Sequence, residues 1–166
     1  MKLRQSILTS VLTSVVLLAA LASPAVSAFA KQPARQVKVF LVALDDNGKS
    51  GRRIGCGDSL VAVTRTVNAP GGATLRAALE ELLAQPHDYD ERLKNYWRGE
   101  NLRLSGVTLR RNGLATIRIT GRGPLVAGVC DAPRITEQIN ATARQFPSVR
   151  RVQVFVNGRT LARALR

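Results

Sequence analysis

The chain has 166 residues with 25 Lys and Arg against 11 Asp and Glu, so its net charge is +14. This length is typical of a single domain. The positive field attracts polyanions in a salt-dependent way. Net charge alone does not identify a partner, and solubility is an alternative reason for it. One histidine and two cysteines without a Cys-x-x-Cys pair exclude the usual structural zinc sites, and we predict neither a metal nor a cofactor.

Residues 1–30 have the pattern of a secretory signal peptide. Two basic residues lie in the first four positions, and the apolar run Ile7–Ala22 follows. Small residues come next, and cleavage after Ala28 or after Ala30 fits equally well. The apolar run is short for a membrane span, so an uncleaved anchor is the less favoured alternative. We therefore expect a secreted or extracytoplasmic protein of the cell envelope, with no transmembrane anchor after cleavage.

The remaining chain divides into a short polar linker, residues 31–36, and a domain over residues 37–166. Without the signal peptide the chain has 23 basic and 11 acidic residues, a net charge of +12. The domain has two cysteines, Cys56 and Cys130. An even number of cysteines in an exported protein predicts a disulfide. That bond would close a loop spanning 74 positions.

Two strands and a helix are predicted in the first half of the domain. Val37–Leu44 is apolar on both faces, as expected inside a sheet, and Leu60–Val67 alternates. Between them, Asp45–Gly48 is a turn cluster; a calcium loop is the alternative, but its other ligands are missing. We expect a helix capped by Thr74 and ended by Pro86. Its apolar stripe consists of Leu75, Ala78, Leu79, Leu82 and Leu83.

The polar segment His87–Glu100 is predicted to be a surface loop. It contains Tyr89, Tyr96 and Trp97. Aromatic side chains in such a loop can stack on sugar rings, but they more often fold back onto the edge of the core.

The second half begins with a predicted hairpin. Leu104–Arg111 and Leu114–Thr120 alternate, and Asn112-Gly113 between them is a strong hairpin signal. In the second of these strands the apolar residues face one way, so one face of the sheet is buried and the other is solvated.

A second helix and a final strand follow. Asp131 or Ala132 is the expected helix cap, with Pro133 in the first turn and Pro147 beyond the end. The buried stripe of this helix consists of Ile135, Ile139, Ala143 and Phe146. Val149–Val156 is the last strand.

The predicted order is β-β-α-β-β-α-β, which indicates an α+β fold. We expect a mostly antiparallel or mixed sheet of about five strands with both helices on one face. The two helical stripes should pack on apolar strand residues, which are Val39, Leu41, Ile117, Ile119, Val152 and Val154.

The succession of these segments resembles the GerMN domain, the sporulation and spore-germination domain of exported bacterial proteins. The segments that carry the resemblance are Val37–Leu44, Leu60–Arg65, Thr74–Leu83 followed by Pro86, Val107–Ile119 and Phe146–Gly158. Together they span nearly all of the domain, in a single copy. The resemblance implies a small α+β domain outside the membrane, similar to the ring-building motif of sporulation assemblies. It also implies a binding or scaffolding role, with no established catalytic residues.

Candidate catalytic groups are few. A Ser/His/Asp triad would need His87 with Asp58 and Ser59, but nothing in their spacing supports it. Paired carboxylates for glycoside hydrolysis would come from Asp88, Asp90 and Glu91 in the loop or from Glu80 and Glu81 on the first helix. Because acidic residues there are usually solvated, we predict that the chain is not an enzyme, and a cell-wall hydrolase is a minority alternative.

We therefore predict a non-catalytic module that binds a cell-envelope polymer or an envelope protein. A self-assembling envelope scaffold is the alternative, and no specific nucleic-acid partner is expected. Arg110, Arg118 and Arg151 should project from the solvated face of the sheet, where they would form an anion-binding patch. Strand parity places Arg111 and Arg150 on the opposite side unless a bend at a strand end turns them.

Overall fold

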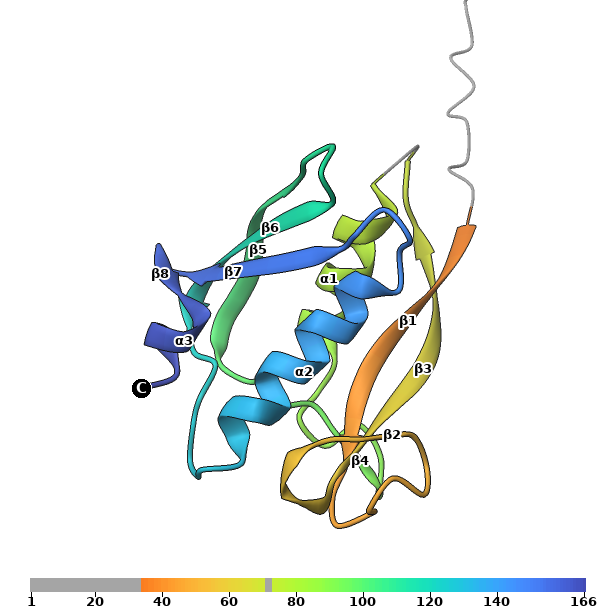
Figure 1. The fold of residues 1–166 in the computed structure, drawn as a ribbon, viewed down its shortest axis with the longest axis vertical. Helices are drawn as coiled ribbons and strands as arrows, with labels where there is room; N and C mark the ends of the chain where they lie inside the picture. Colours follow the sequence, from red (N-terminus) through yellow and green to blue (C-terminus); the bar gives the residue numbers. More distant parts are fainter. Residues whose placement is uncertain (1–33, 71–72) are drawn as a thin grey trace, which may run out of the picture. The chain divides into compact units, whose positions relative to one another are not determined.

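A computed structural model describes residues 34–70 and 73–166 (Figure 1). The predicted signal peptide, residues 1–30, lies outside the described residues. The predicted linker is partly a strand, because the first strand begins at Ala34 rather than at Val37. Within the described ranges, none of the helices combines the length and the apolar character that crossing a membrane requires.

The strands form two four-stranded sheets rather than the single sheet that we predicted. The first sheet has the order β2-β3-β1-β4, and the second has the order β5-β6-β7-β8. In the first, the bounds are Ala34–Ala43 for β1, Arg52–Arg53 for β2, Ser59–Asn68 for β3 and Leu93–Lys94 for β4. In the second, they are Glu100–Leu109 for β5, Leu114–Arg122 for β6, Arg151–Val156 for β7 and Arg159–Thr160 for β8. All pairings are antiparallel except β6 with β7, which is parallel, so the α+β class with antiparallel and mixed pairing is confirmed.

The two long helices lie between the two sheets (Figure 1). Helix α1 spans Thr74–Ala84 and α2 spans Asp131–Arg144; the short elements are the 3-10 turn η1, Gly55–Gly57, and α3, Leu161–Ala164. Helix α1 contacts β1, β3 and β5, whereas α2 contacts β1 and β7. Each long helix therefore packs on both sheets, which corrects the prediction of two helices on one face of one sheet. The predicted order of the long elements is confirmed.

The predicted apolar stripes form the core. The buried members are Leu75, Leu79, Leu82, Ile135, Ile139 and Ala143, and they cluster with the buried strand residues Val39, Leu41, Ile117, Ile119 and Val154. Ala78 is buried in a second cluster with Val37 and Val67. Leu83, Phe146 and Val152 are partly buried against the first cluster. Apolar periodicity therefore identified the inward face of each element, although not the sheet to which it belongs.

Polar side chains of α2 occupy the edge of β1 where a single sheet would need another strand. Gln145 accepts a hydrogen bond from the Lys38 backbone N–H at 2.8 Å and donates to the Lys38 carbonyl at 2.6 Å. The Phe40 N–H donates to the Thr142 hydroxyl at 3.3 Å, and Gln138 donates to the Phe40 carbonyl at 2.8 Å. Because these side chains satisfy the backbone groups of β1 there, β7 pairs in a separate sheet.

The helix starts differ from the predicted caps. Thr74 is the first residue of α1 and its side chain caps nothing. Asp131 is the first residue of α2, preceded by Cys130, and its carboxylate accepts a hydrogen bond from the Ala127 N–H at 2.8 Å instead of capping α2. Pro133 lies in the first turn of α2, as predicted, where its missing N–H is not needed.

The segment after α1 is not a surface loop throughout. It contains β4, and both Tyr96 and Trp97 are buried, with 5% and 2% of their surface exposed. The Trp97 indole N–H donates to the Ile135 carbonyl at 2.9 Å, so its polar group is satisfied inside the core. The aromatic residues therefore fold back, and of the three only Tyr89 is partly accessible.

The predicted hairpin is confirmed between β5 and β6. The Arg110 N–H donates to the Leu114 carbonyl at 3.0 Å and closes a loop of three residues. Gly113 ends this loop with φ +78°, a left-handed conformation that glycine adopts without strain.

Replacing Leu79 with alanine should lower the free energy of unfolding by about 2–5 kcal/mol, because a cavity would replace a side chain that is 1% exposed. Urea denaturation measures the change. The matched control is Leu125→Ala, at a leucine that is 52% exposed, which should change stability by less than about 0.5 kcal/mol. Equal midpoints for the two variants would contradict the packing assignment.

Candidate anion-binding surface

The positive charge is concentrated in the second half of the domain. Residues 34–100 contain ten basic and nine acidic residues, a net charge of +1. Residues 101–166 contain twelve arginines and two acidic residues, a net charge of +10. This second stretch builds α2, α3 and nearly all of the second sheet. The electrostatic field of the domain is therefore strongly one-sided.

Most arginines of the second sheet have no carboxylate partner among the described residues. In strands β5–β8 the ion pair is Arg122 with Glu100, at 3.1 Å between two exposed side chains. By contrast, several basic residues of the first half are paired, for example Arg65 with Glu81 at 2.7 Å and Lys94 with Asp88 at 3.0 Å. Arginines without a partner carboxylate leave their charge available to an external anion.

The strand register places two of the three predicted arginines on one face. Arg118 lies between the buried residues Ile117 and Ile119, so it points away from the core. Arg151 pairs with Leu114 across the parallel β6–β7 ladder and therefore shares the face of Leu114 and Arg118. Along β6, Arg118 lies four positions after Leu114, a distance of about 13 Å.

The third predicted arginine lies at the hairpin. The backbone N–H of Arg110 bonds to the carbonyl of Leu114, so Arg110 and Arg151 lie on opposite sides of that residue. Arg110, Arg118 and Arg151 are all exposed. The three form a spread triangle on the second sheet rather than one tight cluster, and we call these three residues the arginine face.

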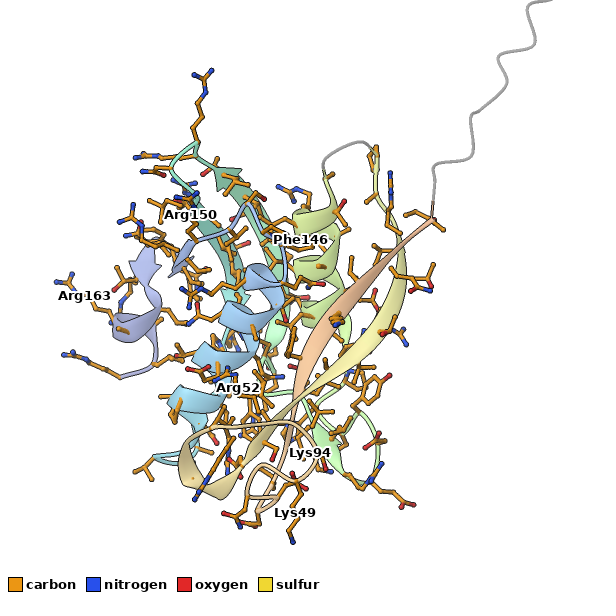
Figure 2. All side chains as sticks on the ribbon, turned by 45° about the vertical axis from the view of Figure 1, so that its right-hand side comes forward. Lys49, Arg52, Lys94, Phe146, Arg150 and Arg163 are labelled. Carbon is orange, nitrogen blue, oxygen red and sulfur yellow. A yellow bond between two sulfur atoms is a disulfide. The ribbon has the colours of Figure 1, made fainter. Side chains whose placement is uncertain are left out.

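Arg111 and Arg150 lie at strand ends, for which the prediction from parity made an exception. Arg111 lies in the hairpin loop and Arg150 lies just before β7, so neither belongs to a strand. Together with Arg110 they line one surface hollow of about 300 Å³. Figure 2 shows Arg150 at this end of the molecule, among other nitrogen-tipped side chains.

The family profile described as Germane, sporulation and spore germination, matches residues 38–162. The chain belongs to this family. The predicted resemblance to GerMN domains is thereby confirmed.

Solved structures of GerMN domains are similar to this chain in fold. The tandem GerMN domains of the sporulation protein GerM from Bacillus subtilis align with a TM-score of 0.54 at 19% identity, over 77% of this chain and 40% of that one. The first GerMN domain of the same protein gives a TM-score of 0.48 at 18% identity, over 76% of this chain and 85% of that one. No curated protein matches the chain.

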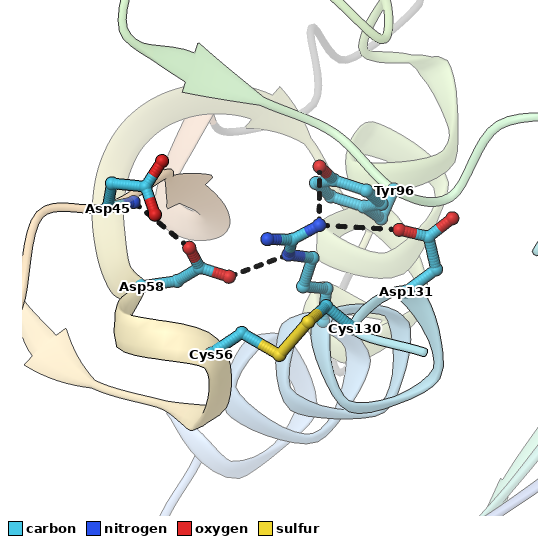
Figure 3. Close-up of a disulfide and its surroundings, with 7 residues drawn as sticks. Asp45, Cys56, Asp58, Tyr96, Cys130 and Asp131 are labelled. Atoms are coloured by element: carbon cyan, nitrogen blue, oxygen red, sulfur yellow. Dashed lines mark hydrogen bonds and ion pairs between the residues drawn. A yellow bond between two sulfur atoms is a disulfide. The ribbon is translucent and has the colours of Figure 1, made fainter. Parts of the chain in front are cut away.

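Cys56 and Cys130 of this GerMN chain lie at disulfide distance. Their sulfur atoms are 1.94 Å apart and their Cα atoms 6.0 Å apart, inside the limit of about 7 Å for a bridge. The bond links η1 to the residue before α2 (Figure 3).

A buried ionic cluster lies beside this bond. Asp58, with 0% of its side chain exposed, accepts a hydrogen bond from Arg134 Nε at 2.6 Å and another from the Asp45 N–H at 3.1 Å. The guanidinium of Arg134 lies 4.8 Å from the ring centroid of Tyr96 and donates to its hydroxyl at 3.1 Å (Figure 3). The pKa of Tyr96 lies above its ordinary value. Burial of the side chain is the main cause, and the positive charge of Arg134 acts in the opposite direction. These contacts give the buried carboxylate of Asp58 both a counter-charge and hydrogen-bond donors.

The candidate triad is not assembled in this GerMN chain. The Nδ1 atom of His87 lies 2.7 Å from the carbonyl of Asn95. The Ser59 hydroxyl is hydrogen-bonded to the carboxylate of Asp46, and Asp58 is committed to Arg134.

The candidate carboxylates also have structural partners. Asp88 pairs with Lys94, and this contact lowers the pKa of Asp88. Asp90 accepts hydrogen bonds from the N–H groups of Arg92 and Leu93 at 2.8 and 2.6 Å, which lowers its pKa. A glycosidase acid needs a raised pKa, so these two carboxylates do not suit that role.

The other candidate carboxylates lie on α1 or beside β4. On α1, Glu80 pairs with Arg76 at 2.9 Å and Glu81 pairs with Arg65, so both are held by cations. Glu91 lines a hollow of about 530 Å³ beside β4. No group of three potential ligands for a metal ion occurs among the described residues.

Proposed function

We propose that this GerMN chain is a non-catalytic module that binds an anionic polymer of the cell envelope through its second sheet. The net charge of +10 on residues 101–166 is the observation that carries the proposal. Location in the envelope rests on the predicted signal peptide in residues 1–30. An acidic envelope protein would present similar charges and is the alternative partner.

The chemistry of arginine suits this role. A guanidinium is always charged at physiological pH, and its planar fork makes two parallel hydrogen bonds to a carboxylate or phosphate group. The arginines of the arginine face lie along neighbouring strands, so they match a ligand whose charges repeat along a chain. Binding of this kind releases counterions and weakens as salt concentration rises.

Replacing Arg110, Arg118 and Arg151 together with glutamine should weaken retention on isolated peptidoglycan sacculi that carry anionic wall polymers by at least about tenfold at low salt. The slope of binding against salt should also decrease, because fewer counterions are released. Co-sedimentation over a salt series measures both quantities.

The matched control replaces Arg35, Arg53 and Arg92 with glutamine. These arginines are exposed and lie in the first half, and their replacement removes as much charge as the arginine-face variant does. Retention should then fall much less than in the first variant. Equal retention of the arginine-face variant and the parent at low salt would contradict the proposal.

A self-assembling scaffold is the second candidate, and the free edge of β3 offers it a first contact between two copies. Strand β2 pairs with β3 only at Leu60 and Ser59, so the edge of β3 beyond Leu60 has no strand partner among the described residues. Such an edge can pair with a strand of another copy. Sedimentation velocity over a concentration series tests this candidate, and a monomer at all concentrations would exclude it.

A further inference from the structure

The hollow at the hairpin end of the second sheet has an unusual lining. It is formed by Leu109 at the end of β5, by Arg110, Arg111 and Gly113 from the hairpin, and by Pro147, Ser148 and Arg150 from the connection between α2 and β7. Its volume of about 300 Å³ is at the lower end of small-ligand pockets. No carboxylate lines it, so the three arginines that line it have no counter-charge within the hollow.

Backbone contacts fix the two walls of the hollow against each other. The N–H groups of Arg150 and Arg151 both donate to the carbonyl of Gly113, at 2.8 and 3.0 Å. Arg144 of α2 donates to the carbonyl of Arg150 at 2.9 Å. The hairpin tip is therefore joined both to α2 and to the start of β7, and the arginines project from an ordered frame.

Glycine at position 113 sets the position of Arg150. A Cβ atom on Gly113 would lie 2.7 Å from Cγ and 2.9 Å from Cβ of Arg150, so the aliphatic part of Arg150 packs directly over the glycine. Packing of this stem limits the freedom of the side chain and lowers the entropy cost of holding its guanidinium at the rim of the hollow.

We infer that this hollow is a subsite for a phosphate group of the anionic polymer; the inference rests on the proposed function. A phosphate presents its oxygens tetrahedrally and can engage more than one arginine fork, whereas a carboxylate offers two oxygens in one plane. Ser148, whose hydroxyl can donate a hydrogen bond, also lines the hollow. Bringing three like charges together costs free energy, which the negative charge of a bound anion offsets.

The subsite is tested with inorganic pyrophosphate as the probe, by calorimetric titration of the full domain at 0.15 M salt. The variant carries Arg111→Gln and Arg150→Gln. Glutamine keeps the Cβ, Cγ and Cδ atoms, so the packing over Gly113 is largely preserved. The matched control carries Arg103→Gln and Arg163→Gln, two exposed arginines of the same half outside the hollow.

We expect the hollow variant to bind pyrophosphate at least about tenfold more weakly than the parent, because two charge-assisted contacts are lost. The control should change by less than about threefold, since its two arginines do not line the hollow and salt screens their charges. Acetate should bind the parent far more weakly than pyrophosphate. Urea midpoints of both variants close to that of the parent show that the fold is kept.

The subsite would be overturned if the parent failed to bind pyrophosphate, if both double variants bound it equally weakly, or if acetate bound as well as pyrophosphate. Retention on sacculi separates the two proposals: if the hollow variant fails with pyrophosphate but is retained like the parent, the polymer-binding function stands without this subsite. Stronger binding to phosphatidylglycerol vesicles than to phosphate-bearing sacculi would overturn the polymer as the source of the phosphate.

Discussion

Replacing Arg134 with glutamine is expected to lower the free energy of unfolding by about 3–5 kcal/mol, because the buried carboxylate of Asp58 loses its counter-charge. Asp58 is fully buried and Arg134 has 15% of its side chain exposed, so water cannot substitute for the guanidinium. The same change removes the cation from the face of the Tyr96 ring. Equilibrium denaturation in urea measures the loss.

The matched control is Arg52→Gln. Arg52 pairs with Glu137 at 2.5 Å, but 58% of the arginine side chain and 35% of the glutamate side chain are exposed. Exposed pairs contribute at most about 1 kcal/mol, so this variant should be close to the parent. The double change of Asp58→Asn with Arg134→Met should recover part of the loss, because it leaves no unpaired buried charge. An Arg134→Gln variant as stable as the control would contradict the assignment.

Breaking the bond between Cys56 and Cys130 is expected to lower the free energy of unfolding by about 4 kcal/mol. The bond spans 74 positions, and the unfolded chain gains the entropy that this long loop otherwise excludes. The change is measured by urea denaturation of the double variant Cys56→Ser, Cys130→Ser beside the parent, each with and without a reductant.

The double variant is its own control, since the reductant should affect the parent and leave the variant unchanged. Mass analysis of the alkylated protein provides an independent check, and two free thiols in the purified protein would show that the bond does not form. The bond and the Arg134–Asp58 pair join the same two segments, so their effects should not be additive when the changes are combined.

The parts of the fold that buried apolar side chains determine were predictable from the sequence, whereas the parts that polar side chains determine were not. The stripes containing Leu79 and Ile139 were predictable because burial of apolar residues imposes a period of 3.6. The division into two sheets was not, because it depends on Gln138, Thr142 and Gln145. These polar residues look like a solvated helix face in the sequence, and nothing local shows that they bond to the edge of a strand.

The candidate site shows the same division. Arg118 and Arg151 were correctly placed on the solvated face because side chains alternate within a strand. Arg111 and Arg150 lie outside the strands, where alternation does not apply. Their meeting at the hollow depends on contacts between the hairpin and the start of β7, which are distant in sequence. A signal was nevertheless present, since both are adjacent to another arginine and to a turn or strand end.

The side chains of α2 that bond to β1 also limit how the first sheet can grow. Gln138, Thr142 and Gln145 bond to the backbone of Lys38 and Phe40, next to the positions of β1 that pair with β4. A strand that approaches this edge of β1 therefore finds those backbone groups already occupied. The part of β3 beyond Leu60, which has no strand partner on its outer side among the described residues, can accept an added strand. Two copies meeting along β3 would use the same edge on each partner, and such a contact is self-complementary. It closes at two chains, so a longer polymer would require a different surface.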